Sequence, residues 1–328
     1  MSDAPVLVVG AGLAGLVAAR SLTEAGRPVV VLDKGRGVGG RLATRRMGRA
    51  VLDHGAQFFT VRGPDLQART EDWLARGLVT VWAHGFGPEP DGHPRYVAAG
   101  GMAALAKDLA AGLDVRTGRP VDALVPTGDG YAATFAGSAS EPVEGCAVVA
   151  TPPVPQTLAL LAAGGVALRP EVSDGVRRLA YHRVLALLVR LDRPAGLPAP
   201  GARQQPEDPT FSFVGDNQAK GISPEPAVTF HAAHQLSAEL WDRPDAEVLD
   251  HLLAAARPLL DPARPVEVQL KRWRYAGPVQ PWPDRTVLAA DRSGPLVLAG
   301  DAFGGPKVEG AHDSGLAAAA AMGRALGG

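Results

Sequence analysis

Apolar and polar positions follow one another in blocks that predict a mixed α/β protein. Residues 5–9 and 28–32 are apolar runs of strand length, and between them apolar residues recur at helical spacing from Leu13 to Leu22, before the helix stop Gly26. The first 33 residues therefore predict a strand, a tight turn, a helix and a second strand, which is one βαβ unit of a parallel sheet.

Further blocks of both kinds follow along the chain. The predicted helices span 64–77, 102–113, 156–163, 170–179 and 246–260, with a last one beginning near Ala311. The predicted strands span 143–150, 184–191, 211–215, 227–234, 266–273 and 295–299, with shorter runs near Tyr96, Val121 and residues 131–135. We expect a loop rich in glycine and arginine over 34–49, a short strand after a turn over 53–60, and a proline-rich loop over 196–209.

The order of these blocks predicts two domains. Prolines at 152, 153 and 155 interrupt regular structure, and a mixed sheet with helices follows before the last strand of the first domain. The expected fold is α/β: a Rossmann-like nucleotide-binding domain with an inserted mixed-sheet α+β substrate domain. The nucleotide-binding domain is expected over 1–62, 96–152 and 285–328, and the substrate domain over 63–95 and 153–284.

Composition narrows the classes of partner. The 328 residues include 33 basic and 34 acidic ones, so no broad cationic field favours nucleic acid or an anionic membrane. One cysteine, Cys146, excludes an internal disulfide and a site of several thiolates, and we expect it to be a buried strand thiol. No apolar run reaches the roughly 18 to 20 residues of a membrane span. The histidines at 54, 84, 93 and 312 have no metal-ligand spacing with carboxylates or the cysteine. We expect a cytoplasmic protein without a metal.

Glycines at 10, 12 and 15 follow the first predicted strand at the spacing of a dinucleotide-binding turn. They allow, in order, the tight turn, the close approach of a pyrophosphate to the backbone, and the packing of helix on strand. Asp33 ends the second strand, where its carboxylate can accept hydrogen bonds from ribose hydroxyls. This pattern predicts a bound dinucleotide but does not separate NAD from FAD.

Two further segments favour FAD. Residues 36–41 supply glycine backbone and Arg41 for another phosphate contact, and Gly300-Asp301 follows the apolar run 296–299. Together with Asp33, these segments resemble the FAD-binding signatures of the amine-oxidase superfamily of flavoproteins. The resemblance implies that Asp301 holds the ribityl and pyrophosphate side of FAD, and that the last helix points its positive end at flavin N1 and O2.

The resemblance also implies a set of residues around the cofactor, with the flavin ring at the domain interface and no covalent link through the single cysteine. The residues expected to contact FAD are Gly10, Gly12, Leu13, Ala14, Gly15, Asp33, Lys34, Gly40, Arg41, Leu42, Gln57, Phe58, Val121, Thr151, Gly300, Asp301, Glu309, Gly310, Ala311 and Ser314.

A narrower resemblance rests on five segments in order. Asp33-Lys34, residues 39–41, 53–60, 271–274 and 300–303 are similar to the renalase family, especially its bacterial members. This implies a non-covalent FAD oxidase that takes a hydride from dihydronicotinamide dinucleotides carrying it at ring carbon 2 or 6. Such an enzyme returns NAD(P)+ while oxygen becomes hydrogen peroxide.

The residues suit that chemistry, although two other functions stay open. Oxidation of a dihydropyridine needs stacking on the flavin and no base, because the product gains aromaticity without losing a proton. Amine oxidases of the superfamily commonly hold a lysine near flavin N5; the matching position here is near Ala186, and strand 184–191 contains no lysine. A flavin amine oxidase or desaturase is the second hypothesis, and a non-catalytic FAD-binding redox sensor is the third.

Candidates for the substrate pocket come from several aromatic and polar residues. Trp273, Tyr275 and Trp282 crowd one segment but fit core packing equally well. Strand alternation would turn one of Phe58 and Phe59 to the cofactor and the other to the core. The candidates for catalysis or substrate contact are His231, Gln57, Phe58, Asn217, Trp273, Arg274 and Tyr275. His231 also fits a structural hydrogen-bonding role, Asn217 fits a turn, and Lys271, Arg272 and Arg274 fit either substrate phosphates or solvent.

Overall fold

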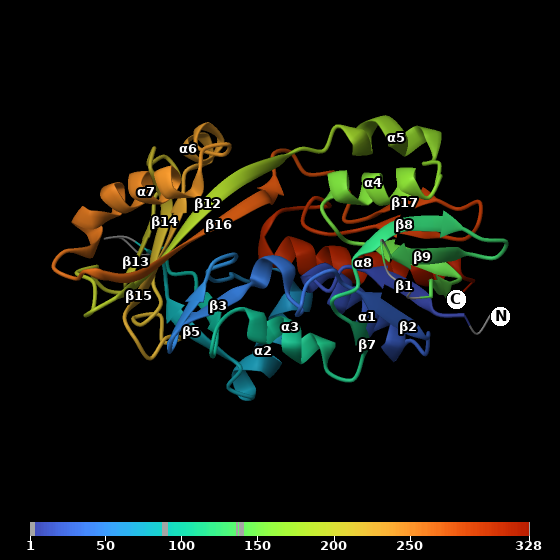
Figure 1. Ribbon diagram of the computed structural model, residues 1–328. Coiled ribbons are helices and arrows are strands. Elements are labelled where there is room, and N and C mark those ends of the chain that lie inside the picture. Colours follow the sequence, from blue (N-terminus) through green and yellow to red (C-terminus); the bar gives the residue numbers. More distant parts are fainter. Residues whose placement is uncertain (1–3, 87–90, 136, 138–140, 328) are drawn as a thin grey trace. The chain divides into compact units, whose positions relative to one another are not determined.

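The computed structural model describes the chain except for residues 1–3, 87–90, 136, 138–140 and 328 (Figure 1). The chain forms two compact units that interleave in sequence. The first unit holds Met1–Gly40, Ala106–Ala180 and Gly277–Gly328, and the second holds Arg41–Leu105 and Tyr181–Ala276.

The first unit is built on a six-stranded sheet. Its strand order is β17 (Val287–Ala290), β18 (Leu296–Leu298), β11 (Ala147–Ala150), β1 (Val6–Val9), β2 (Val29–Leu32) and β7 (Asp114–Arg116). Neighbouring strands are parallel except for β17, which runs antiparallel to β18. The sheet therefore pairs β18, near the end of the sequence, with β11, and β11 with β1. Residues of β1, β11 and β18 are buried throughout, as expected for parallel strands covered on both faces.

Helices α1 (Leu13–Glu24) and α8 (Lys307–Ala325) pack together in this unit. Gly315 allows their close approach, since a Cβ there would lie 2.5 Å from the Ala14 carbonyl oxygen. The same unit carries an antiparallel sheet of β8 (Val121–Pro126), β9 (Tyr131–Phe135) and β10 (Val143–Gly145), with α4 (Val154–Ala163) and α5 (Pro170–Arg177). Helix α3 (Ala103–Ala110) begins in the second unit and ends in the first.

The second unit is built on a five-stranded sheet. Its strand order is β13 (Ala202–Gln204), β14 (Phe211–Asp216), β15 (Ala227–Ala232), β12 (Tyr181–Leu191) and β16 (Pro265–Pro278). Alternate residues face opposite sides. One side packs against α7 (Asp245–Leu260), where Leu187, Phe230 and Leu252 belong to one buried apolar cluster with Val268 and Leu270 against it.

The other side of this sheet faces the hairpin of β3 (Thr44–Met47) and β4 (Ala50–Asp53), and we call it the hairpin face. Met47 and Leu52 pack there against Leu188 and Ala227. By alternation the hairpin face carries Leu188, Phe213, Thr229, His231, Gln269, Lys271 and Trp273. Helices α2 (Pro64–Ala75) and α6 (His234–Glu239) and the pair β5 (Val79–Ala83) and β6 (Arg95–Ala98) complete the unit.

The expected fold class is confirmed: a Rossmann-like sheet accompanies a second unit with a mixed set of strands and helices. The predicted domain boundaries, which place residues 41–62 in the nucleotide-binding domain, differ from the bounds of the compact units and stay a prediction.

Three local predictions are wrong. The loop expected over 34–49 contains a 3-10 turn (Gly40–Leu42) and β3, whose arginine side chains hide the strand pattern. No strand covers 53–60, because β4 ends at Asp53. The proline-rich segment 196–209, expected to be a loop, contains the short strand β13. Strands β5, β7 and β17 escaped prediction because they are short or polar.

Two predictions near the functional segments also need correction. The last helix begins at Lys307 instead of near Ala311, directly after Pro306. Cys146 lies between β10 and β11 instead of inside a strand, and it is only half-buried. Its thiol lies 3.2 Å from the Ala4 carbonyl oxygen, and burial raises its pKa.

Candidate cofactor and substrate sites

The glycine turn between β1 and α1 has the predicted geometry. Gly10 has a φ of +102°, which favours glycine, and a Cβ at Gly15 would lie 2.0 Å from the Gly10 carbonyl oxygen. Thr151 follows β11 and donates its hydroxyl to the Val9 carbonyl, 2.9 Å away. A Cβ at Gly10 would meet that hydroxyl at 2.5 Å, so glycine and threonine fix the turn together.

Helix α1 begins directly after this turn, with Gly12 at its N-terminus. Gly12 is its N-cap and no side chain caps the first backbone N–H groups, which leaves them for an anion. Asp33, after β2, accepts from the Ala11 and Gly35 N–H groups, each at 2.6 Å. These bonds hold the carboxylate beside the turn, and each oxygen keeps a further lone pair for a ribose hydroxyl.

The segment at 39–40 lies against the same turn. The Gly39 N–H donates to the Ala11 carbonyl at 2.8 Å, and a Cβ at Gly40 would sit 3.6 Å from the Cα of Gly12. Arg41 begins the second unit, where its guanidinium donates to the Tyr275 carbonyl at 3.3 Å. The expected phosphate contact of Arg41 stays a prediction, as do the cofactor contacts of Lys34, Leu42 and Val121.

The C-terminal segment is fixed by Ser314. Its hydroxyl accepts from the Gly300 N–H at 2.8 Å and donates to the Arg285 carbonyl at 2.6 Å. Asp301, which follows, is buried with 8% of its surface exposed. A Cβ at Gly310 would lie 1.9 Å from the Gly305 carbonyl oxygen, so the first turn of α8, with Glu309 and Ala311, packs closely on the glycine turn before it.

This arrangement fits a dinucleotide. It brings together an uncapped helix N-terminus, glycines at close approaches and the carboxylate Asp33, all in the first unit. Asp301 stands at the end of β18, two strands from β1 in the same parallel sheet. Ligands of such sheets bind at the carboxyl ends of the strands.

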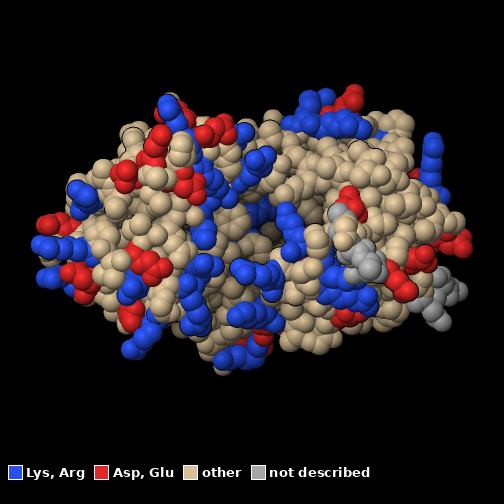
Figure 2. All heavy atoms as spheres, in the orientation of Figure 1, with Lys and Arg blue, Asp and Glu red and all other residues tan. Residues whose placement is uncertain are grey.

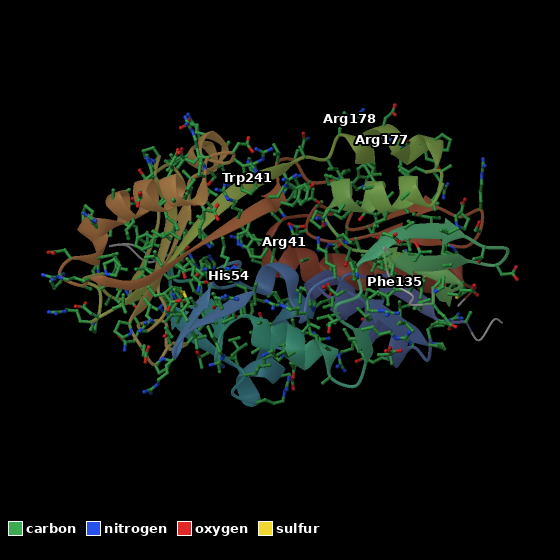
Figure 3. The ribbon with its side chains drawn as sticks, in the orientation of Figure 1. Arg41, His54, Phe135, Arg177, Arg178 and Trp241 are labelled. Carbon is green, nitrogen blue, oxygen red and sulfur yellow. The ribbon has the colours of Figure 1, made fainter. Side chains whose placement is uncertain are left out.

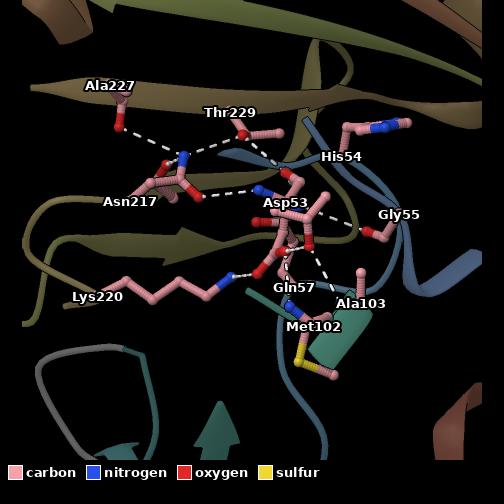
Figure 4. A network of polar contacts seen from close by, with 12 residues as sticks. Asp53, His54, Gly55, Gln57, Met102, Ala103, Asn217, Lys220, Ala227 and Thr229 are labelled. Atoms are coloured by element: carbon pink, nitrogen blue, oxygen red, sulfur yellow. Dashed lines mark hydrogen bonds and ion pairs between the residues drawn. The ribbon is translucent and has the colours of Figure 1, made fainter. Parts of the chain in front are cut away.

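A buried polar network organises the hairpin face of the second unit (Figure 4). Asp53, at the end of β4, accepts from the Lys220 ammonium and the Thr44 hydroxyl, each at 2.6 Å, and from the Met102 N–H at 2.8 Å. Neither side chain of the Asp53–Lys220 pair has exposed surface. Burial lowers the pKa of Lys220, and the Asp53 carboxylate opposes that lowering.

Asn217 and Thr229 extend the network. The Asn217 side chain accepts from the Asp53 N–H at 3.3 Å and donates to the Thr229 hydroxyl at 3.0 Å, which in turn donates to the Asp53 carbonyl at 2.8 Å. Asn217 begins the turn that follows β14, as one reading of the sequence expected, and its fully buried side chain also belongs to the network.

Gln57 and His231 meet beside this network. The Gln57 amide donates to the Asp53 carbonyl at 2.7 Å and lies 3.4 Å from His231 Nε2, which is also 3.3 Å from the His54 carbonyl. The Trp273 indole donates to the same carbonyl at 2.6 Å and stacks on the His54 ring with centroids 5.3 Å apart. In the described part of the chain, Gln57 Oε1 and His54 Nδ1 are buried without a hydrogen-bond partner.

Both histidines are neutral at pH 7. Burial is the main cause that lowers the pKa of His231 to about 4. Burial, with Lys271 and Arg45 adding to it, lowers the pKa of His54 to about 4 as well. Figure 3 shows His54 beside β3. These side chains can therefore give or accept hydrogen bonds as neutral imidazoles, but they carry no charge.

Aromatic side chains gather next to His231. Phe213 lies 6.1 Å from the His231 ring and 5.9 Å from Phe58, and Phe86 contacts Phe58 edge to face at 5.0 Å. The Arg95 guanidinium lies 5.7 Å from the ring centroids of both Phe58 and Phe86. Phe59 is buried and packs against Trp73 and Tyr96. Phe58 and Phe59 therefore have different neighbours, but not through strand alternation, because residues 54–60 do not form a strand.

The structure thus brings some sequence-predicted residues together and separates others. His231, Gln57, Asn217, Trp273 and Phe58 lie in one connected set, whereas Arg274 is exposed and Tyr275 packs on Tyr181 at 5.5 Å. Sequence reasoning missed the roles of Lys220, Trp82, Phe86 and Arg95 as neighbours of that set. No motif marks them, because only the pairing of distant strands and loops brings them to one face.

Comparison with known families assigns the chain. Residues 8–73 match the NAD(P)-binding Rossmann-like domain, and residues 78–323 match the flavin containing amine oxidoreductase family. The second match spans most of the chain, and the chain therefore belongs to that family. Proteins of this family contain a flavin, and the N-terminal turn, Asp33 and the Gly300 segment form an arrangement that fits a dinucleotide such as FAD.

Individual relatives agree with this assignment. The chain is similar to putrescine oxidase of Kocuria rosea, 43% identical over 67 residues, which are 20% of this chain and 14% of that protein. It thus aligns with about a seventh of that relative's length. Cyclohexylamine oxidase of Brevibacterium oxydans IH-35A has the same fold, with a TM-score of 0.69, 16% identity and coverage of 99% of this chain and 100% of the other. A putrescine oxidase structure with bound putrescine gives a TM-score of 0.67 at 17% identity, covering 97% and 98%.

Among the described residues, no helix is long and apolar enough to cross a membrane. In the same residues, no group of three or more histidine, cysteine or acidic side chains is placed to hold a metal ion.

Proposed function

We propose that this protein is an FAD oxidase of renalase type, acting on dihydronicotinamide dinucleotides that carry their extra hydride at ring carbon 2 or 6. The substrate loses two electrons and one proton as a hydride and leaves as aromatic NAD(P)+. FAD, when bound, supplies the two-electron acceptor, and oxygen then takes the electrons and two protons to become hydrogen peroxide.

The sign of the charge on the hairpin face is the observation that carries the proposal. Its buried carboxylate, Asp53, is already paired with Lys220, and Glu267 lies 3.4 Å from Arg190. Lys271 and Arg45 are close enough to lower the pKa of His54. An alkylammonium ion would be repelled by these cations, whereas a dinucleotide brings phosphates of opposite charge.

The neutral groups also suit a dihydropyridine. Hydride loss leaves the ring aromatic without releasing a proton, so no charged base is needed and two neutral histidines suffice as hydrogen-bonding groups. Gln57 Oε1, buried and without a partner among the described residues, can accept from the substrate carboxamide. Ala186 pairs in register with His231 and places a methyl group, not an amine, at that position.

The test is reduction of the flavin in the absence of oxygen by a panel of donors. We expect the flavin absorption to bleach with 2- and 6-dihydroNAD(P), with NAD(P)+ as product and one hydrogen peroxide per turnover when oxygen is admitted. Bleaching by 4-dihydroNAD(P)H alone, or by none of the isomers, would exclude the proposal.

Amine oxidation is the second candidate, because the relatives named above are a putrescine oxidase and a cyclohexylamine oxidase. Putrescine and cyclohexylamine therefore belong in the same panel. Fast flavin reduction by either amine, with no reduction by the dihydronicotinamides, would replace the first proposal with this one.

A further inference from the structure

We propose that Arg45 and Lys271 form a phosphate-binding subsite on the hairpin face, which holds the pyrophosphate of the substrate dinucleotide. The inference rests on the proposed function for the identity of the ligand. The subsite itself is built from side chains of the second unit alone, on β3 and β16.

Arg45 is directed to β16 by the alternation of β3. It shares a face of that strand with Met47, which is buried against Leu188, and its Nε donates to the Gln269 side chain at 3.2 Å. Gln269 is a neutral partner, and its own amide donates to Glu267 at 3.1 Å. The guanidinium is thus anchored over β16 while its charge stays uncompensated.

Lys271 is the next residue along β16 on the same face. In a strand, residues two apart are separated by about 7 Å, so Lys271 stands between Gln269, which binds Arg45, and Trp273, which stacks on His54. The subsite therefore adjoins the ring pair of Trp273 and His54. A dinucleotide likewise places its phosphates a short distance from a flat ring.

No carboxylate neutralises the two cations. Within the residues that the structure describes, neither Arg45 nor Lys271 lies within 4.0 Å of an acidic group. Partial burial lowers the pKa of Lys271, and the nearby Arg45 guanidinium lowers it further, because like charges repel. An anion between them would remove this repulsion. Figure 2 shows lysine and arginine side chains gathered over the part of the second unit that holds β3 and β16.

The neighbouring cations are excluded from this role by their own contacts. Arg272 points to the opposite face of β16, where its guanidinium donates to Asp245 at 2.7 Å and lies 5.8 Å from the Trp241 ring. Arg274 is exposed on that same opposite face. Arg95 is paired with Asp91 at 2.5 Å. Of the three cations of segment 271–274, Lys271 alone is left on the hairpin face.

The experiment uses the full chain loaded with FAD and the variants Arg45→Gln and Lys271→Gln, singly and together. Arg46→Gln is the matched control, because Arg46 is the adjacent arginine but is exposed on the other face of β3. Steady-state kinetics with 6-dihydroNAD are compared with those of an N-alkyl dihydronicotinamide of the same ring isomer, which has no phosphate. Binding of inorganic pyrophosphate and of inorganic phosphate is measured by calorimetry and as competitive inhibition.

We expect each single substitution to raise KM for the dinucleotide about tenfold with little change in kcat, and the double substitution to raise it further. The phosphate-free substrate should keep its KM in every variant. Pyrophosphate should bind the parent and the Arg46→Gln protein alike and bind the double variant at least tenfold more weakly, with inorganic phosphate weaker throughout. An unchanged dinucleotide KM in the double variant, or an equal loss in Arg46→Gln, would overturn the subsite.

Failure of the proposed function is distinguishable from failure of the subsite. If no dihydronicotinamide reduces the flavin but pyrophosphate still binds through Arg45 and Lys271, the substrate assignment falls and the phosphate site stands. If the isomers are oxidised but both substitutions leave the affinity for pyrophosphate unchanged, the proposed subsite is wrong and the proposed function is unaffected.

Discussion

Asp53 and Lys220 form a charge pair without exposed side-chain surface, held by Thr44 and the Met102 N–H. Lys220→Met should lower the free energy of unfolding by about 3 to 5 kcal/mol, because it leaves a buried carboxylate without its counter-ion. Urea unfolding measures this loss. The double variant Asp53→Asn with Lys220→Met should regain part of it, since no unpaired charge remains. Equal losses in the single and double variants would show that the pairing itself contributes little.

Burial of His231 on the hairpin face makes the free energy of unfolding depend on pH. Its pKa is lowered to about 4, so between pH 6.5 and 4 the unfolded chain binds a proton that the folded protein does not. Stability from this group is therefore complete above pH 6.5 and is lost as pH falls towards 4, by up to about 3 kcal/mol. His231→Gln should flatten the pH dependence of unfolding free energy between pH 5 and 7, leaving the same-signed contribution of His54. The exposed His251→Gln should keep the parent slope, and a parent-like slope in His231→Gln would contradict the assignment.

The cofactor residues could be predicted from sequence further than the substrate residues. Gly10, Gly12, Gly15 and Asp33 lie within one local βαβ unit, so spacing along the chain fixes their geometry. Lys220 meets Asp53 only through the tertiary arrangement of a turn after β14 and the end of β4. The spacing of apolar residues along a strand or helix cannot predict a pair such as Asp53 and Lys220, which lie 167 residues apart in the sequence.

Two glycines at the start of helix α1, Gly12 and Gly15, have different surroundings. A Cβ at Gly15 would lie 2.0 Å from the Gly10 carbonyl oxygen, so Gly15→Ala should lower the Tm of the flavin-free protein as well as its FAD affinity. Gly12 has a φ of −78° and open space around its Cβ position, so Gly12→Ala should keep that Tm and weaken FAD binding at the pyrophosphate alone. Thermal unfolding and FAD titration give the two values. Equal behaviour of both variants would contradict this division.

Helix α8 offers a second contrast within one element. Gly315→Ala should destabilise the protein, because its Cβ would lie 2.5 Å from the Ala14 carbonyl oxygen in α1. Gly323→Ala, in the same helix with no atom within 4 Å of its Cβ position, should stabilise it by up to about 1 kcal/mol through helix propensity. Chemical unfolding should therefore move the two midpoints in opposite directions. A stabilising Gly315→Ala would mean that the helices separate at little cost.

Sequence patterns predicted the buried strands of the parallel sheet but not the polar strand β3. Apolar runs predicted β1, β2, β11 and β18 because both faces of the parallel sheet are covered. Strand β3 was missed because Arg45 and Arg46 interrupt its apolar pattern, and yet it supplies Arg45 to the hairpin face. The two arginines that hide the strand pattern therefore include the one whose side chain β3 directs to β16.

The net charge of −1 gives the chain no overall field to attract a dinucleotide, so any electrostatic attraction must come from local cations. If Arg45 and Lys271 provide it, kcat/KM for 6-dihydroNAD should fall several-fold as ionic strength rises from about 10 to 150 mM, because the screening length shrinks from about 30 to 8 Å. The double variant Arg45→Gln with Lys271→Gln should lose most of this salt dependence, and the phosphate-free substrate should show little in either protein. A steep salt dependence that survives the double substitution would place the attraction elsewhere on the molecule.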